Sequence, residues 1–343
     1  MQRKNNEIWP INQVFIFFSS AFIILVILKY SAEILTPFLI SLSLAIVLSP
    51  LLVYLEKKHV PKMVSLLIIV ILSLIPIIVV GSYIGKEIQD FANNFQDMSQ
   101  NFSDLIDKGI VYLNKLGISI TNKEVNRLFE NSSFGEIIKD IVSQIGDRFS
   151  NIFLIIFIVS FMLLESKSFY DKMIKITQDY GGNLEEDKEI IEKIKSYFLI
   201  KVKTSLLTAL LILVVLWYFG SHYYYLWATL AFFLNFIPVI GSILAAIPPI
   251  VMAFINQNPT DAFWILLWYM IINLIVGNVI EPRVMGRGLG LSVLIIFLSM
   301  TFWGWIFGPT GMILSVPLTM VAQHFFGRYD ETKWIALLLS DYK

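Results

Sequence analysis

Five long apolar runs alternate with polar segments along the chain. They cover residues 11–30, 34–55, 63–85, 202–219 and 262–280. Each comes close to the roughly 20 apolar residues that a helix needs to cross a hydrocarbon core of about 30 Å. The pattern therefore predicts an all-α polytopic membrane protein.

A polar stretch with seven Lys/Arg and ten Asp/Glu occupies residues 86–148. Its apolar residues keep helical spacing, as at Ile88 and Phe91, so we expect an amphipathic helical insert on the extracytoplasmic side. A second apolar stripe begins at Phe134 and leads into the apolar block 152–164. We predict one long helix that starts outside the bilayer and becomes the fourth of about six full spans.

Residues 165–203 are charged again, with eight acids and eight lysines. Ile190, Ile194 and Tyr197 form an apolar stripe within them, so we expect the fourth span to continue into a cytoplasmic amphipathic helix. The Lys/Glu run 185–203 is expected to be its solvated face.

Two later segments do not fit a plain span. Residues 223–255 would measure about 50 Å as one helix, and they are too few for two full spans and a turn. Two half-helices that meet near Pro238 and Gly241 fit better, which predicts a re-entrant hairpin. Residues 289–326 are broken around Pro309. They predict a second hairpin or two spans that are barely long enough to cross the membrane. The alternative to six spans plus two hairpins is eight spans.

The two broken segments resemble each other. Gly241-Ser-Ile-Leu-Ala-Ala-Ile-Pro248 and Gly311-Met-Ile-Leu-Ser-Val-Pro317 share a glycine, Ile-Leu and a closing proline, and each follows a plain span. This is the layout of a span-plus-hairpin unit used twice.

Composition narrows the classes of function. Only 15% of the 343 residues are charged and 57% are hydrophobic, whereas soluble domains carry about 25% charged residues. The formal net charge is zero, so no basic field favours nucleic acid. With no cysteine and three scattered histidines, we expect no metal and no cofactor. The chain lacks a phosphate-binding P-loop, a His-Glu-x-x-His and a Gly-x-Ser-x-Gly motif, so we expect no ATP site and no enzyme.

Basic residues in short loops mark the cytoplasmic side. Arg3 and Lys4, the 57–62 loop and the 165–203 segment all become cytoplasmic if both termini lie inside a bacterial plasma membrane. A hairpin at 223–255 also keeps Arg287 inside, whereas a full crossing would place it outside. The two span-plus-hairpin units then enter the membrane from opposite faces. This makes an inverted repeat, which is typical of secondary transporters.

Irregular backbone within a membrane is stable only where protein buries it or water reaches it. Asn235, Pro238 and Gly241 at the first break are therefore candidates for a solute or ion pathway. The alternative is a proline kink that only shapes helix packing.

The penultimate span adds a second group of candidates. Asn273, Gly277 and Glu281 follow at i, i+4 and i+8, which predicts one shared face, and Pro282 is expected to end the helix. Glu281 is a carboxylate of the kind that handles protons or sodium in membranes, or else it caps an anchoring loop. The full set of pathway candidates is Asn235, Pro238, Gly241, Asn273, Asn278, Glu281, Arg283, Gly286, Gly311 and Pro317.

Three motifs together resemble the autoinducer-2 exporter family, also called PerM-like permeases. They are Asn235-Phe-Ile-Pro-Val-Ile-Gly241, Asn278-Val-Ile-Glu-Pro-Arg-Val-Met-Gly286 and Gly308-Pro-Thr-Gly311 with Val316-Pro317. The resemblance covers essentially the whole chain and implies eight hydrophobic segments and a homo-oligomer. Some members are implicated in export of the furanone signal autoinducer-2 and others in sodium(lithium)/proton antiport. Val293 stands where many members have proline.

These observations favour a secondary transporter that exports a small polar solute, with autoinducer-2 as a candidate, by alternating access. Sodium(lithium)/proton antiport is the first alternative, and a non-transporting scaffold or receptor that uses the insert is the second. The expected division is 1–85 for three spans, 86–148 for the insert, 149–203 for the fourth span and its cytoplasmic helix, 204–326 for the transport unit and 327–343 for a cytoplasmic tail.

The topology has a direct test because the chain contains no cysteine. Arg287→Cys is expected to react with a membrane-impermeant maleimide only from the cytoplasmic side, as a Lys57→Cys control should. Labelling of position 287 from outside would rule out the hairpin at 223–255.

Overall fold

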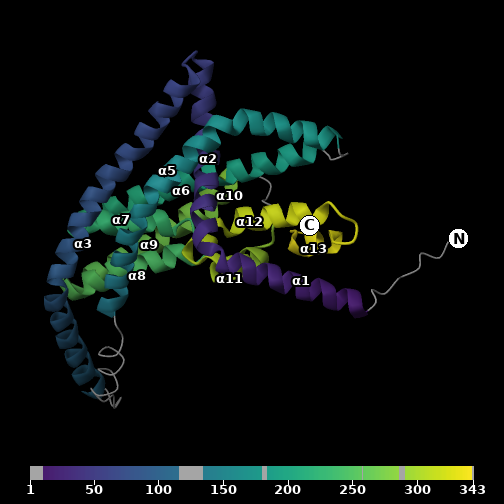
Figure 1. The fold of residues 1–343 in the computed structure, drawn as a ribbon. Coiled ribbons are helices and arrows are strands. Elements are labelled where there is room, and N and C mark those ends of the chain that lie inside the picture. Colours follow the sequence, from purple (N-terminus) through teal and green to yellow (C-terminus); the bar gives the residue numbers. More distant parts are fainter. Residues whose placement is uncertain (1–10, 116–133, 180–183, 257, 286–289, 342–343) are drawn as a thin grey trace.

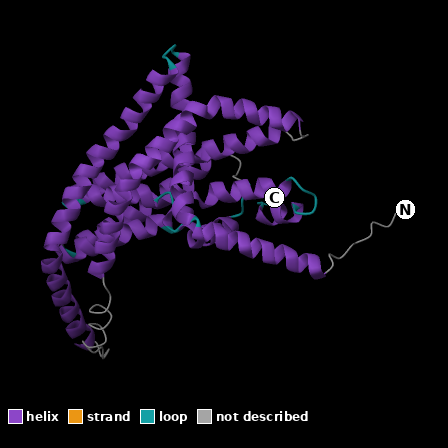
Figure 2. Cartoon of the chain, in the orientation of Figure 1, coloured by secondary structure: helices purple, strands orange, loops and turns teal. Residues whose placement is uncertain are grey.

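The computed structural model describes residues 11–115, 134–179, 184–256, 258–285 and 290–341, and this part of the chain is almost entirely helical. Figure 2 shows long helices joined by short loops, with no strand drawn in the described part. One isolated antiparallel bridge joins Leu291 to Ser340. The predicted all-α class is confirmed.

Four helices make up the N-terminal half. They are α1 (Ile11–Tyr30), α2 (Ala32–Lys57), α3 (Lys62–Lys115) and α5 (Phe134–Asp179). α2 packs against α1, α3 and α5, and the two longest helices, α3 and α5, also contact each other (Figure 1).

Shorter helices follow one long helix in the C-terminal half. They are α6 (Leu184–Tyr218), α7 (Tyr224–Leu234), α8 (Gly241–Asn256), α9 (Pro259–Ile275), the π-helical turn η1 (Val276–Ile280), α10 (Glu281–Met285), α11 (Val293–Phe307), α12 (Pro309–Gly327) and α13 (Lys333–Leu339). α6 contacts α2 and α5 as well as α7, α9 and α12, so it joins the two halves of the molecule.

Five helical stretches are long and apolar enough to cross a membrane: Ala32–Lys57, Lys62–Phe91, Ile152–Ile176, Glu185–Tyr218 and Pro259–Val284. The first predicted span corresponds to α1. Large apolar side chains on these helices remain exposed, as at Leu67, Phe157 and Val214. Such a surface is stable in hydrocarbon rather than in water, so the chain is a multi-pass membrane protein.

The described parts of the polar insert are continuous with the membrane helices. α3 extends through the predicted end of the third span at residue 85 to Lys115, and α5 runs without a break from Phe134 into the fourth span. The intervening residues 116–133 lie outside the described part. A single helix, α6, also crosses residue 203, where the expected transport unit begins.

Both predicted breaks are present, and each is flanked by helices that pack against each other. α7 and α8 have 11 and 16 residues, about 17 and 24 Å, and the loop 235–240 joins them. α11 and α12 have 15 and 19 residues, about 22 and 28 Å, and Gly308 alone separates them. α7 and α8 are thus the pair that is clearly too short for two full crossings.

The two hairpins use glycine in the same way. A Cβ atom at Gly241 would overlap the carbonyl oxygen of Leu234, and one at Gly311 would overlap that of Trp303. In both hairpins the second helix starts so close to the end of the first that only a hydrogen fits between them. The two hairpins share this close contact, and the internal repeat of a span and a hairpin stays a prediction.

Gly241→Ala is expected to destabilise the protein by about 1–3 kcal/mol, because the new methyl group must displace backbone atoms. Gly277→Ala is the matched control, since a Cβ there meets no atom within 4 Å. Thermal unfolding of the purified variants in detergent measures the difference. Equal melting temperatures for the two variants would contradict the proposed role of Gly241.

Candidate functional site

One face of α6 carries buried polar side chains where the helix is otherwise apolar. Tyr197, Lys201, Thr204, Ser205 and Thr208 follow each other at helical spacing, and all are at most 6% exposed. Ionisable and polar groups buried in a helix of a membrane protein usually face other protein groups or a water-filled cavity. This face is therefore the centre of the candidate site.

Lys201 forms a buried ion pair with Glu281 at the start of α10. The Nζ to Oε1 distance is 2.7 Å, and the two side chains are 8% and 15% exposed. Lys201 Nζ also donates a hydrogen bond to the carbonyl oxygen of Asn235, 3.2 Å away. One ammonium group thus ties α6 to the first hairpin and to the end of the penultimate span.

The broken end of α7 supplies the acceptor for this hydrogen bond. The last carbonyls of a helix have no intrahelical partner. Pro238 cannot donate an amide hydrogen bond, and Val239 has φ 63°, a strained conformation for a β-branched residue. The Asn235 side chain turns to α6, where Nδ2 donates to Ser205 Oγ at 3.0 Å. Asn235 is thereby held to α6 at two points.

A change of helix type brings Glu281 to the site. Tyr269, Ile272 and Val276 are buried at the usual spacing, and then η1 adds a residue to the turn. The amide of Glu281 donates to the carbonyl oxygen of Val276, five residues earlier. Pro282 explains the wider turn, because it lacks an amide hydrogen and its ring would clash with the carbonyl four residues before it. π-Turns of this kind often occur at functional sites.

One hydroxyl group contacts the ion pair, and two further buried hydroxyls lie on the same face of α6. Thr204 Oγ1 lies 3.5 Å from Glu281 Oε2 and 3.2 Å from the carbonyl oxygen of Lys201. The Tyr197 hydroxyl and Thr208 Oγ1 are buried, and neither has a hydrogen-bond partner in the described part of the chain. Since a buried polar group without a partner is costly, these two atoms are available to water or to a polar solute.

The structure brings only some of the predicted residues together. Asn235 and Glu281 meet at Lys201, and Pro238 and Gly241 shape the loop that presents Asn235. Gly311 and Pro317 are buried in the second hairpin, where they pack α12. Gly286 lies outside the described residues.

One expectation about the penultimate span was wrong, namely that Pro282 ends the helix. Gly277 is exposed at η1, and a role of Asn273, Gly277 and Asn278 along a pathway stays a prediction. Asn278 is exposed as well, and Asn273 is only half-buried. Pro282 does not end the helix but lies within α10, and Arg283 is exposed while Glu281 pairs with Lys201.

Sequence reasoning missed Lys201. The run 185–203 was expected to be solvated, which holds for Glu189 and Lys193, whose side chains are 63% and 46% exposed. Lys201 is buried instead. The signal was present in the apolar stripe, because Lys201 follows Tyr197 at i+4 and Ile194 at i+7.

Comparison with known proteins adds the following. Residues 14–331 match the model of the AI-2E transporter family. The chain is 31% identical to the AI-2 transport protein TqsA of Escherichia coli (strain K12), over 93% of each chain. It is 34% identical to a putative transport protein of Haemophilus influenzae, over 94% of each chain. It is 25% identical to the putative transport protein YhhT of Escherichia coli (strain K12), over 94% of this chain and 92% of YhhT.

Lys201→Met is expected to destabilise the protein by about 3–5 kcal/mol, because it leaves the Glu281 carboxylate buried without its partner. The exposed neighbour Lys203→Met is the control and should change stability by less than about 0.5 kcal/mol. The double variant Lys201→Met with Glu281→Gln should recover much of the loss, because no unpaired charge remains. Unfolding in detergent measures the stability of all three variants. Equal losses of stability in Lys201→Met and Lys203→Met would contradict the pairing.

Proposed function

The chain belongs to the AI-2E family of transporters, and from this premise we propose that it is a secondary transporter that exports a small polar solute by alternating access. The observation that carries the proposal is the buried pair of Lys201 and Glu281, which joins α6, the tip of the first hairpin and the π-turn. Charges are expensive within a membrane and are kept there mainly where they serve a pathway.

The ion pair acts as a latch in this proposal. With Lys201 bound to both Glu281 and the Asn235 carbonyl, the first hairpin is held against α6. A solute that binds Glu281 or the Asn235 backbone replaces part of this interaction and weakens the hold on the hairpin. Binding and hairpin release are then coupled, as differential binding to two conformations requires.

The hydroxyl groups near the latch suit a solute with several hydrogen-bonding groups. Tyr197, Thr204 and Thr208 offer hydroxyls from one helix, and Asn235 adds a carbonyl from the hairpin tip. A relative in the family is named as an AI-2 transport protein. We therefore take autoinducer-2 as the first candidate solute.

Within residues 204–326, the two hairpins are the parts expected to move. They would shift against α6 and spans one to four in an elevator-like step, within a homo-oligomer in the bacterial plasma membrane and with both termini in the cytoplasm. The packing of Gly241 against Leu234 and of Gly311 against Trp303 favours hairpins that move as rigid bodies.

Sodium(lithium)/proton antiport is the second candidate, and one contact favours it. The Glu281 carboxylate is occupied by an ammonium group, which a proton or a sodium ion could replace. Lys201 and the ion would then compete for one site, which is a sufficient basis for coupling.

Wild-type protein in liposomes loaded with autoinducer-2 is expected to export it, and Glu281→Gln should reduce export by about tenfold or more, because the latch charge is lost. Glu189→Gln removes an exposed carboxylate and serves as the control. The double variant Lys201→Met with Glu281→Gln should fold but remain inactive.

Two outcomes would change this assignment. Full export by Glu281→Gln would remove the latch from the mechanism. Absence of autoinducer-2 flux in the wild type, combined with a sodium-driven signal from a pH-sensitive dye in the lumen, would replace solute export by antiport.

A further inference from the structure

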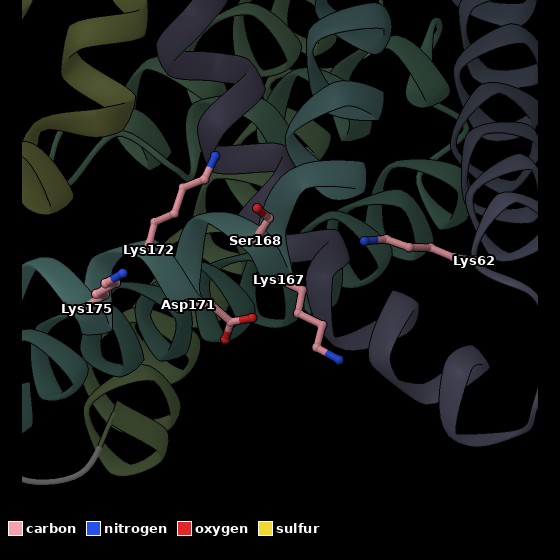
Figure 3. A pocket seen from close by; sticks show the side chains of 6 residues that line it. All are labelled: Lys62, Lys167, Ser168, Asp171, Lys172 and Lys175. Atoms are coloured by element: carbon pink, nitrogen blue, oxygen red, sulfur yellow. The ribbon is translucent and has the colours of Figure 1, made fainter.

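A surface hollow lies at the polar ends of α3 and α5, on elements other than those of the latch. It is lined by Lys62, Lys167, Ser168, Asp171, Lys172 and Lys175 (Figure 3). Five of the six come from one stretch of α5, where helical spacing places them along one side. Lys62, at the first turn of α3, points across toward that helix (Figure 3).

The hollow lies where the apolar parts of both helices end. Lys62 Nζ donates a hydrogen bond to the carbonyl oxygen of Leu164, the last residue of the apolar block on α5. The apolar stretch of α3 begins directly after Lys62, with Met63 64% exposed. Phe161 and Phe169 are also exposed on α5. The lysine ammonium groups and the exposed apolar side chains of α3 and α5 therefore adjoin where the apolar stretches of the two helices end.

The charges in the hollow favour an anion. Four lysines and a single carboxylate, that of Asp171, line the hollow, and Lys167, Lys172 and Lys175 are exposed. Lysine is a compact, strongly hydrated point charge that suits phosphate, and each lysine near an anionic membrane surface strengthens binding. The Ser168 hydroxyl adds a hydrogen-bond donor.

We propose that this hollow binds the phosphate group of an anionic phospholipid, with the acyl chains on the exposed apolar side chains of α3 and α5. A membrane lipid suits the site better than a free phosphate because the apolar surface continues from the rim of the hollow. Lysines on the cytoplasmic side set the orientation of a membrane protein by their number alone. That role does not require lysines of two helices to line one hollow. The lipid would bridge α3 and α5 where Lys62 already joins them.

Native mass spectrometry of the full chain in detergent tests the proposal. The protein is titrated with phosphatidylglycerol and with phosphatidylcholine of the same acyl chains. The test variant carries Lys167→Gln, Lys172→Gln and Lys175→Gln. The control variant loses the same charge at three exposed lysines elsewhere, with Lys193→Gln, Lys203→Gln and Lys333→Gln.

The wild type and the control should retain phosphatidylglycerol, and the test variant should bind it about tenfold or more weakly, because it loses three of the four cations. Inorganic phosphate in large excess should displace no more lipid than chloride of equal ionic strength. The proposal fails if the two triple variants bind alike, if phosphatidylcholine binds as tightly, or if phosphate specifically displaces the lipid. Thermal unfolding verifies that the test variant is folded.

Discussion

Hydrocarbon offers no hydrogen bonds, so every backbone amide and carbonyl within the membrane needs a partner in the protein. Long helices meet this requirement alone, which explains why the described part of the chain is almost entirely helical. The requirement becomes difficult only where a helix breaks. At the end of α7 the Asn235 carbonyl receives a hydrogen bond from Lys201, so the break depends on a charged side chain of another helix. The ammonium group needs a counter-ion in turn, and Glu281 provides it.

The two hairpins have the same close backbone contact at a glycine, but they differ in their polar contacts. Each places a glycine against the preceding helix, and an added methyl group would overlap a carbonyl there. The first hairpin ends in a six-residue loop that presents polar groups to α6. The second turns at Gly308, with φ 63°, and Trp303 Nε1 donates to Thr319 Oγ1 within the hairpin at 2.9 Å. The first hairpin therefore makes a polar contact with α6, and the second is held mainly by packing.

Charge is placed at two levels of the molecule. The ion pair lies buried among helices, where it links the first hairpin to α6. The lysines of α3 and α5 lie at the ends of apolar stretches and face outward. The first arrangement suits a movable contact, and the second suits attachment of the α3–α5 scaffold to the lipid surface. A transporter that rocks or slides needs both a part that moves and a part that stays in place.

The sequence by itself determined the membrane class, the long helices and both breaks, because these follow from local apolar length and from proline and glycine. It also indicated Asn235 and Glu281 as site residues. It did not identify their partner: Lys201 stands in a charged run that includes solvated residues such as Glu189 and Lys193, and the packing of α6 against the hairpin buries it. It also wrongly ended the helix at Pro282, which lies within α10 directly after the π-turn η1. Tertiary structure decided these points, since burial depends on neighbours distant in sequence and the wider turn lets the helix continue past a proline.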